Sequence, residues 1–210
     1  MKKTGTIICL TGGAGAGKSR ISEILREEYG FTVIDSDTIT KEYVMNPGQE
    51  GYEKIVDYFG EGMVLPDKSL NRKVLAVVAF SDREYLEKLN SFTHPATIKI
   101  IKEKCNEFFA RGEKIVFVES AIPFTADYGK FCDMFWYVYA KKSERIERLK
   151  KSRGYSDDKC RDIFKFQSSD KEYREHASVI INNTDKSDID SVKRTISSAL
   201  RDIFDDKKRP

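Results

Sequence analysis

Residues 12–19 read Gly-Gly-Ala-Gly-Ala-Gly-Lys-Ser and match the pattern G-x-x-x-x-G-K-[ST] in full. The stretch follows a short apolar run, Thr6 to Thr11, and precedes a segment with helical spacing. A strand that turns tightly into a helix is the context in which this pattern binds phosphate. Glycines let successive backbone N–H groups point inward, and the helix N-terminus adds a positive dipole end. The stretch therefore predicts a nucleotide phosphate site on an α/β fold.

The residues of this loop have separate expected roles. Lys18 is expected to reach the β- and γ-phosphates as a catalytic cation, and Ser19 to offer its hydroxyl to Mg²⁺. The rest of the phosphate cradle is expected to come from Thr11, Gly12, Gly13, Ala14, Gly15, Ala16 and Gly17. The loop identifies neither the nucleotide nor the reaction. A guanine-reading Asn-Lys-x-Asp sequence is missing, and Asp57 to Gly60 spells D-x-x-G in a helix-like stretch, so a GTP switch is disfavoured.

Four further apolar, β-branched runs predict strands at Thr32 to Asp35, Lys114 to Glu119, Met134 to Tyr139 and Ser178 to Ile181. Together with the first run they predict a parallel five-stranded sheet flanked by helices, of the P-loop nucleoside-triphosphate-hydrolase type. We expect one domain over residues 1–210, with its core at about 1–40, 112–142 and 174–204. A helical substrate-binding insertion is expected at about 41–111 and a helical lid at about 143–173.

Acidic residues follow two of the predicted strands, where ligands collect in open α/β sheets. Asp35 and Asp37 follow the second strand, and either carboxylate could accept the proton of an acceptor hydroxyl while the other caps the next helix. Glu119 closes the third strand, where an acid can hold Mg²⁺ or only solvate the strand end.

The segment after the fourth strand is strongly basic, with Arg145, Arg148, Lys150, Lys151, Arg153 and Arg161. Such a segment can form a lid that places a guanidinium on the transferring phosphoryl group. A solvated basic helix is the alternative. His94, before Pro95, is either an acceptor-site residue or a capped histidine in a turn.

The composition excludes several other classes of protein. Lys and Arg exceed Asp and Glu by only 37 to 34, which is a weak basis for nucleic-acid binding. The four cysteines lie far apart without metal-ligand spacing, which fits a reduced, cytoplasmic protein. The short apolar run before Gly12 is too brief for an export signal or a membrane span. We therefore expect no nucleic-acid and no membrane partner.

Beyond these patterns, the chain resembles the dephospho-coenzyme A kinase family over nearly its whole length. The matching residues, in the family's order, are Leu10-Thr11-Gly12-Gly13, Asp35-Ser36-Asp37, Lys41-Glu42, Phe59-Gly60, Leu70-Asn71-Arg72, Val78-Ala79-Phe80, Leu89-Asn90, Thr93-His94-Pro95, Glu144-Arg145, Arg148-Leu149, Gln167 and Val179-Ile180-Ile181-Asn182-Asn183. Most of these matches are weak singly, but their joint order is highly specific.

The resemblance implies a nucleotide core, a helical coenzyme A-binding subdomain and a lid. It implies that ATP with Mg²⁺ donates its γ-phosphoryl group to the ribose 3′-hydroxyl of dephospho-coenzyme A. By the same resemblance Asp37 is the base, Asp35, Arg72 and His94 are on the substrate side, and Asn183 lies near the adenine. A nucleoside or nucleotide kinase of the same fold is the alternative activity.

The chain departs from the family pattern in three places. Asn71 stands where the family often has Asp, and Ala121-Ile122-Pro123 replaces the common Pro-Leu-Leu after the third strand. Ser152 occupies the position where the lid usually carries an Arg, and Arg153 follows it directly. The resemblance therefore implies a catalytic lid arginine at Arg153, as the substitute for the missing one, or at Arg148 of the Arg-Leu pair.

Overall fold

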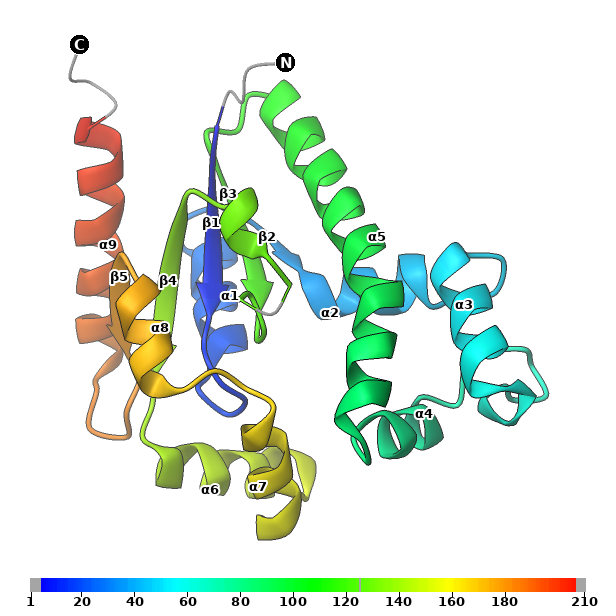
Figure 1. Cartoon of the computed structure of the whole chain (residues 1–210). Helices are drawn as coiled ribbons and strands as arrows, with labels where there is room; N and C mark the ends of the chain where they lie inside the picture. Colours follow the sequence, from blue (N-terminus) through cyan, green and yellow to red (C-terminus); the bar gives the residue numbers. More distant parts are fainter. Residues whose placement is uncertain (1–4, 125, 207–210) are drawn as a thin grey trace.

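The computed structural model describes residues 5–124 and 126–206 of the chain. A five-stranded parallel sheet with the order β2-β3-β1-β4-β5 forms its centre (Figure 1). The strands are β1 (Thr6–Thr11), β2 (Thr32–Asp35), β3 (Ile115–Ser120), β4 (Met134–Tyr139) and β5 (Val179–Asn182). The parallel five-stranded sheet predicted from the sequence is confirmed: β1, β2 and β4 have the predicted bounds, and β3 and β5 begin and end one residue later.

The register of the sheet brings the carboxyl ends of its strands together. Glu119 on β3 pairs with Leu10 on β1 and with Asp35 on β2. Thr11, the last residue of β1, pairs with Ser120 on one side and Tyr137 on the other. The acids predicted after two separate strands therefore lie at the same edge as the phosphate loop, where a ligand of an open α/β sheet binds.

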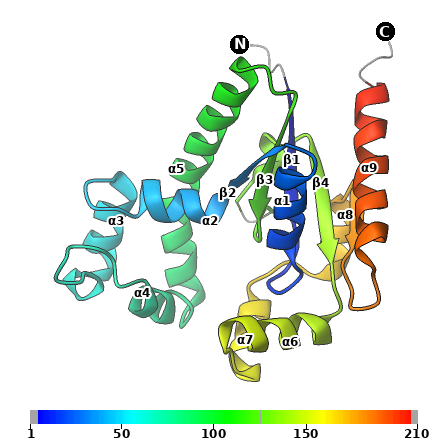
Figure 2. The same cartoon turned by 180° about the vertical axis from the view of Figure 1, so that it is seen from behind.

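Helices cover both faces of the sheet (Figures 1 and 2). On one face α1 (Lys18–Glu27) and α9 (Ile189–Asp206) pack over Leu10 and Trp136. On the other face α5 (Arg83–Ala110) packs over Cys9 and Val118. All six residues of β1 are buried, because a central parallel strand has an apolar layer on each side.

A helical insertion extends from the edge of the sheet beside β2 (Figure 1). It consists of α2 (Ser36–Ile39), a π-helical turn (Thr40–Val44), α3 (Glu50–Phe59), a 3₁₀ turn (Glu61–Met63), α4 (Arg72–Ala79) and α5. These helices form a separate apolar cluster that includes Ile55, Leu70 and Leu75. The sequence Asp57 to Gly60 ends α3, so the helical reading of that stretch is confirmed and the switch-loop match is accidental.

The basic segment forms three helices, α6 (Lys142–Arg153), α7 (Asp157–Lys165) and α8 (Asp170–His176). Gly154, in the left-handed region with φ +64°, ends α6 and allows the chain to turn into α7. In Figures 1 and 2, α6 and α7 lie beyond the carboxyl ends of the strands. Phe166, directly after α7, contacts Phe80 of the insertion with ring centroids 5.1 Å apart.

No helix in residues 5–124 and 126–206 combines the length and the apolar character that a membrane span requires.

Candidate active site

The phosphate loop needs glycine at three positions, Gly12, Gly15 and Gly17, for reasons of space as well as backbone conformation. Gly12 has φ +149°, and a Cβ there would lie 2.5 Å from the carbonyl oxygen of Val138 on β4. Gly17 has φ +92°, and a Cβ there would collide with the side-chain amide of Asn183. The loop is therefore seated between β4 and the residue that follows β5, which fixes its shape before any ligand arrives.

Lys18, the first residue of α1, folds back across the loop, and its Nζ donates to the carbonyl oxygen of Gly12 at 2.9 Å. Burial lowers the pKa of Lys18, whereas the negative charges of Glu119 and Asp37 act to raise it. The two strand-end acids therefore both face the region of this ammonium group and favour its charged form.

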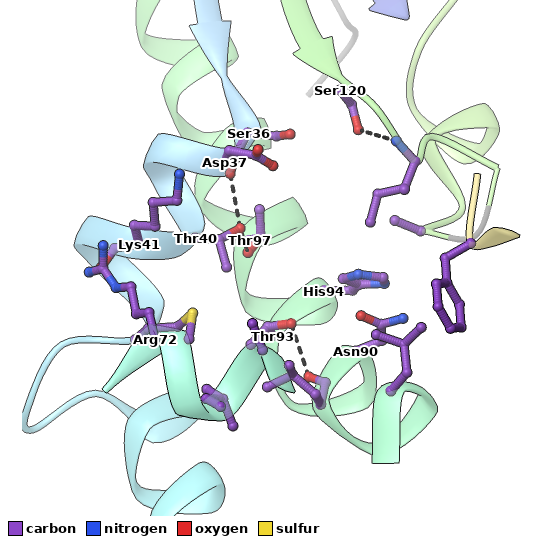
Figure 3. Close-up of a pocket in the computed structure, with 18 of the residues that line it drawn as sticks. Ser36, Asp37, Thr40, Lys41, Arg72, Asn90, Thr93, His94, Thr97 and Ser120 are labelled. Atoms are coloured by element: carbon purple, nitrogen blue, oxygen red, sulfur yellow. Dashed lines mark hydrogen bonds between the residues drawn. The ribbon is translucent and has the colours of Figure 1, made fainter. Parts of the chain in front are cut away.

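The structure gives Asp35 and Asp37 different surroundings, a distinction that sequence spacing could not make. Asp35 is the N-cap of α2, and its carboxylate accepts hydrogen bonds from Asp37 N at 2.9 Å and from Thr38 Oγ1 at 3.0 Å. Asp37 is exposed and its carboxylate lines the adjoining cavity (Figure 3). Asp35 thus stabilises the start of a helix, and Asp37 is the acid available to a ligand in the cavity.

The oxygen donors near Lys18 fit a Mg²⁺ ion that the nucleotide would share. Ser19 is exposed on the first turn of α1, and Glu119 accepts a hydrogen bond from Ser22 Oγ at 2.7 Å. Over the described residues, no group of three or more His, Cys, Asp and Glu side chains could hold a metal alone. Mg²⁺ in nucleotide sites usually takes one or two protein oxygens and completes its shell with phosphate and water.

The two nominated lid arginines lie in different surroundings. Arg148 Nη2 donates to the carbonyl oxygen of Asn183 at 2.8 Å and pairs with Asp185 at 2.7 Å. Asn183 in turn donates its side-chain amide to the carbonyl oxygen of Ala16 at 2.8 Å. Arg153 is exposed at the end of α6, with its guanidinium carbon 5.9 Å from the ring of Tyr155. Arg148 therefore ties the loop after β5 to the phosphate loop, and its Nη1 also donates to the carbonyl oxygen of Ala16 at 3.4 Å. Arg153 is exposed, and its positive charge acts to lower the pKa of Lys18.

Sequence reasoning gave no specific role to two residues that contact the phosphate loop directly. Arg145 Nε donates to the carbonyl oxygen of Ala14 at 2.8 Å, and Gln167 Oε1 accepts from Ala14 N at 2.9 Å. Arg145 lies three positions before Arg148, a spacing that places both side chains on neighbouring parts of one helix surface. That spacing is the one signal in the sequence that could have singled out Arg145 within the basic segment.

A cavity of about 400 Å³ opens between the insertion, the edge of the sheet and the lid. Apolar side chains of α4, α5 and α7 form much of its wall, including Leu75, Leu89 and Ile163. Its polar side chains include Asp37, Lys41, Arg72, Asn90 and His94 (Figure 3). A mainly apolar cavity with a few placed polar groups is the usual form of a small-molecule site.

Arg72 and His94, predicted as substrate-side residues, both line this cavity. Arg72 begins α4, and its Nη2 donates to the carbonyl oxygen of Lys41 at 3.1 Å. His94 lies inside α5 together with Pro95, so the alternative of a histidine in a turn is wrong. In Figure 3 the ring of His94 and the amide of Asn90 both point into the cavity from α5.

Burial lowers the pKa of His94 below its ordinary value near 6.5. The unfolded chain therefore takes up this proton at a higher pH than the folded protein, and stability is lost as pH falls below about 6.5 toward the folded pKa. We expect His94→Gln to flatten the fall in the free energy of unfolding between about pH 7 and pH 5, measured by urea denaturation. The same fall in the variant as in the wild type would contradict this assignment.

Comparison with known proteins gives this arrangement a family. The dephospho-CoA kinase family model matches residues 6–188. A dephospho-CoA kinase of Carboxydothermus hydrogenoformans is 34% identical over 195 residues, which cover 93% of each chain. A Thermus thermophilus protein of known structure has a TM-score of 0.78 at 25% identity, covering 95% of this chain and 98% of that one.

The fold recurs in two solved kinases of lower identity. The dephospho-CoA kinase from Campylobacter jejuni has a TM-score of 0.65 at 24% identity, covering 92% of this chain and 95% of that one. A shikimate kinase from Bacteroides thetaiotaomicron has a TM-score of 0.54 at 14% identity, covering 95% and 98%. The fold is thus that of the P-loop kinases, and the chain belongs to the dephospho-CoA kinase family.

Proposed function

We propose that this protein transfers the γ-phosphoryl group of ATP to the ribose 3′-hydroxyl of dephospho-coenzyme A, giving coenzyme A and ADP. The observation that carries the proposal is the place of Asp37. Its carboxylate lines the cavity, and its negative charge acts to raise the pKa of Lys18 in the phosphate loop. A hydroxyl bound in the cavity next to Asp37 would therefore lie on the side of the loop where the terminal phosphate is expected.

The residues divide between the two substrates. The phosphate loop, from Thr11 to Ser19, would hold the triphosphate, with Lys18 neutralising charge on its terminal groups. Asp37 would accept or orient the proton of the acceptor hydroxyl. Ser19 and Glu119 would hold Mg²⁺, which supplies positive charge to the phosphate oxygens during transfer. Asn183 would lie toward the adenine of ATP, as the family resemblance implies.

The chemistry of the cavity suits the proposed acceptor. Dephospho-coenzyme A joins an adenosine through a diphosphate to a long, largely uncharged arm. The apolar walls of α4 and α5 match that arm, whereas Lys41 and Arg72 provide cations for the diphosphate. His94, kept from protonation by burial, would serve as a neutral hydrogen-bonding group and not as a further cation.

The acceptor can be tested directly by measuring ADP release in a coupled assay with dephospho-coenzyme A, adenosine and AMP offered separately. We expect turnover with dephospho-coenzyme A to exceed that with the other two acceptors by at least about a hundredfold, because only it fills the apolar cavity and meets both cations. Faster turnover with adenosine or AMP would instead identify a nucleoside or nucleotide kinase.

Arg72→Ala is expected to raise the KM for dephospho-coenzyme A by about tenfold and to leave the KM for ATP nearly unchanged. Arg72 lines the acceptor cavity, and a lost charge-assisted hydrogen bond typically weakens binding by about this factor. Steady-state kinetics with each substrate varied in turn provides the measurement. Lys73→Ala removes a neighbouring exposed cation of α4 and serves as the control. Equal effects on both KM values would count against this division of the site.

A further inference from the structure

The backbone of Ala14, at the tip of the phosphate loop, is held entirely by residues of the lid. Its N–H donates to Gln167 Oε1 at 2.9 Å, and its carbonyl oxygen accepts from Arg145 Nε at 2.8 Å. Arg145 Nη2 also donates to the same Gln167 oxygen at 3.0 Å. Arg145, Gln167 and Ala14 therefore form a closed hydrogen-bonded triangle between α6, the chain after α7 and the loop.

Arg145 is a partly buried cation that no carboxylate of the described residues contacts directly, although the negative charge of Asp170 acts to raise its pKa. Its guanidinium carbon lies 4.2 Å from the ring centroid of Phe164. Burial lowers the pKa of Arg145 and is the largest effect on it. Among the residues that the structure describes, no carboxylate forms an ion pair with it, in contrast to Arg148, which pairs with Asp185. A partly desolvated cation without a direct ion-pair partner gains more from an approaching anion than one that is already paired.

Two glycines of the phosphate loop, Gly13 and Gly15, leave the space that Arg145 occupies. A Cβ at Gly13 would collide with the guanidinium of Arg145, and a Cβ at Gly15 would lie 2.5 Å from the carbonyl oxygen of Arg145. Arg145 and Lys18 both donate to carbonyl oxygens of the phosphate loop, at Ala14 and Gly12, and the positive charges of Arg145 and Arg153 act to lower the pKa of Lys18. Such close placement of like charges favours binding of a polyanion between them.

We propose that Arg145, oriented by Gln167, is a nucleotide-binding residue of this kinase: it fixes the Ala14 turn of the phosphate loop and supplies positive charge to the bound phosphates. In this role it compensates for Ser152, whose hydroxyl donates to the carbonyl oxygen of Arg148 at 2.6 Å and so turns back onto its own helix. Gln167 acts as a positioning residue through Arg145 and Ala14. The proposal rests on the nucleotide half of the proposed function and not on the identity of the acceptor.

Isothermal titration of the full chain with the non-hydrolysable ATP analogue AMP-PNP and Mg²⁺ provides the test. Arg145→Gln is expected to raise the Kd by about tenfold or more and to make the Kd less sensitive to added salt, because one charge-assisted contact is lost. Gln167→Ala is expected to raise the Kd by about threefold to tenfold, since the charge remains but its orientation is lost. Lys142→Gln removes an exposed charge from the start of α6 and is expected to stay within about twofold of wild type.

Binding of AMP-PNP by Arg145→Gln within twofold of wild type, with an unchanged salt dependence, would overturn the proposal. Thermal unfolding without nucleotide separates binding from folding, and we expect Arg145→Gln and Lys142→Gln to unfold cooperatively. If Arg145→Gln does not fold, Arg145→Lys decides: it keeps the charge but cannot span both Ala14 and Gln167, so a Kd equal to wild type contradicts the assigned role. No acceptor is present in these titrations, so a failed assay with dephospho-coenzyme A would overturn the proposed acceptor alone.

Discussion

Lys18→Ala is expected to lower the rate of phosphoryl transfer by about a hundredfold to a thousandfold, the range seen when one preorganised group that stabilises transition-state charge is removed. The Nζ of Lys18 lies within the phosphate loop, where it donates to the carbonyl oxygen of Gly12 at 2.9 Å. Glu119 and Asp37 favour its charged form against the effect of burial. Removing this cation leaves the developing charge on the transferred group without its nearest partner.

Single-turnover transfer with saturating ATP measures this effect separately from nucleotide binding. Arg20→Ala is a matched control, because Arg20 is an exposed cation two positions along the same helix. Burial lowers the pKa of Lys18, so its charge does not favour folding, and we expect Lys18→Ala to be no less stable than wild type. Transfer at a rate close to wild type in Lys18→Ala would contradict the assignment of the phosphate loop.

The sheet and the phosphate loop could be predicted because their signals are local. Parallel strands buried on both faces need continuous apolar runs, and Thr6–Thr11 and Ile115–Ser120 supply them. The phosphate loop needs glycine where φ is positive, and Gly15 and Gly17 show that need in the sequence itself. Each of these features depends on residues within a few positions of one another.

The contacts of Arg145 could not be predicted in this way. It meets Ala14 across 131 positions of sequence, and only the packing of α6 beyond the sheet brings the two together. Its neighbours in the basic segment look equally suitable by composition, although Arg148 forms an ion pair with Asp185 and Arg153 is exposed. Arg148 also donates to the loop, at the carbonyl oxygen of Ala16. Which cations of the lid contact the phosphate loop, and at which of its residues, is decided by tertiary structure and not by charge density.

The length of α5 was hidden for a related reason. Pro95 cannot donate the helical hydrogen bond and usually marks a helix end, yet α5 continues through it from Arg83 to Ala110. Packing of Ile101 and Cys105 against the sheet and of Leu89 and Phe92 against the insertion holds both halves of the helix in place. Tertiary contacts thus outweigh the local preference, and they carry His94 into the cavity.

The two acids after β2 have opposite expected responses to the same substitution. Asp35 has a structural task, since its carboxylate accepts hydrogen bonds from the first turn of α2. Asn is almost as good an N-cap as Asp, so Asp35→Asn should change stability and transfer only slightly. Asp37 makes no such cap, and its carboxylate lines the acceptor cavity, so its charge is available for the reaction.

Asp37→Asn is therefore expected to bind ATP nearly normally and to transfer phosphate at least about a hundredfold more slowly, because a positioned base typically contributes about 10²- to 10⁴-fold. Asn preserves the shape of the side chain but cannot take up the proton of the acceptor hydroxyl. Loss of a group that acts mainly in the transition state lowers the catalytic rate and spares ground-state affinity. Isothermal titration with ATP and single-turnover transfer, applied to both variants, measure the two quantities. An inactive Asp35→Asn beside an active Asp37→Asn would move the base to Asp35 and require α2 to open during the reaction.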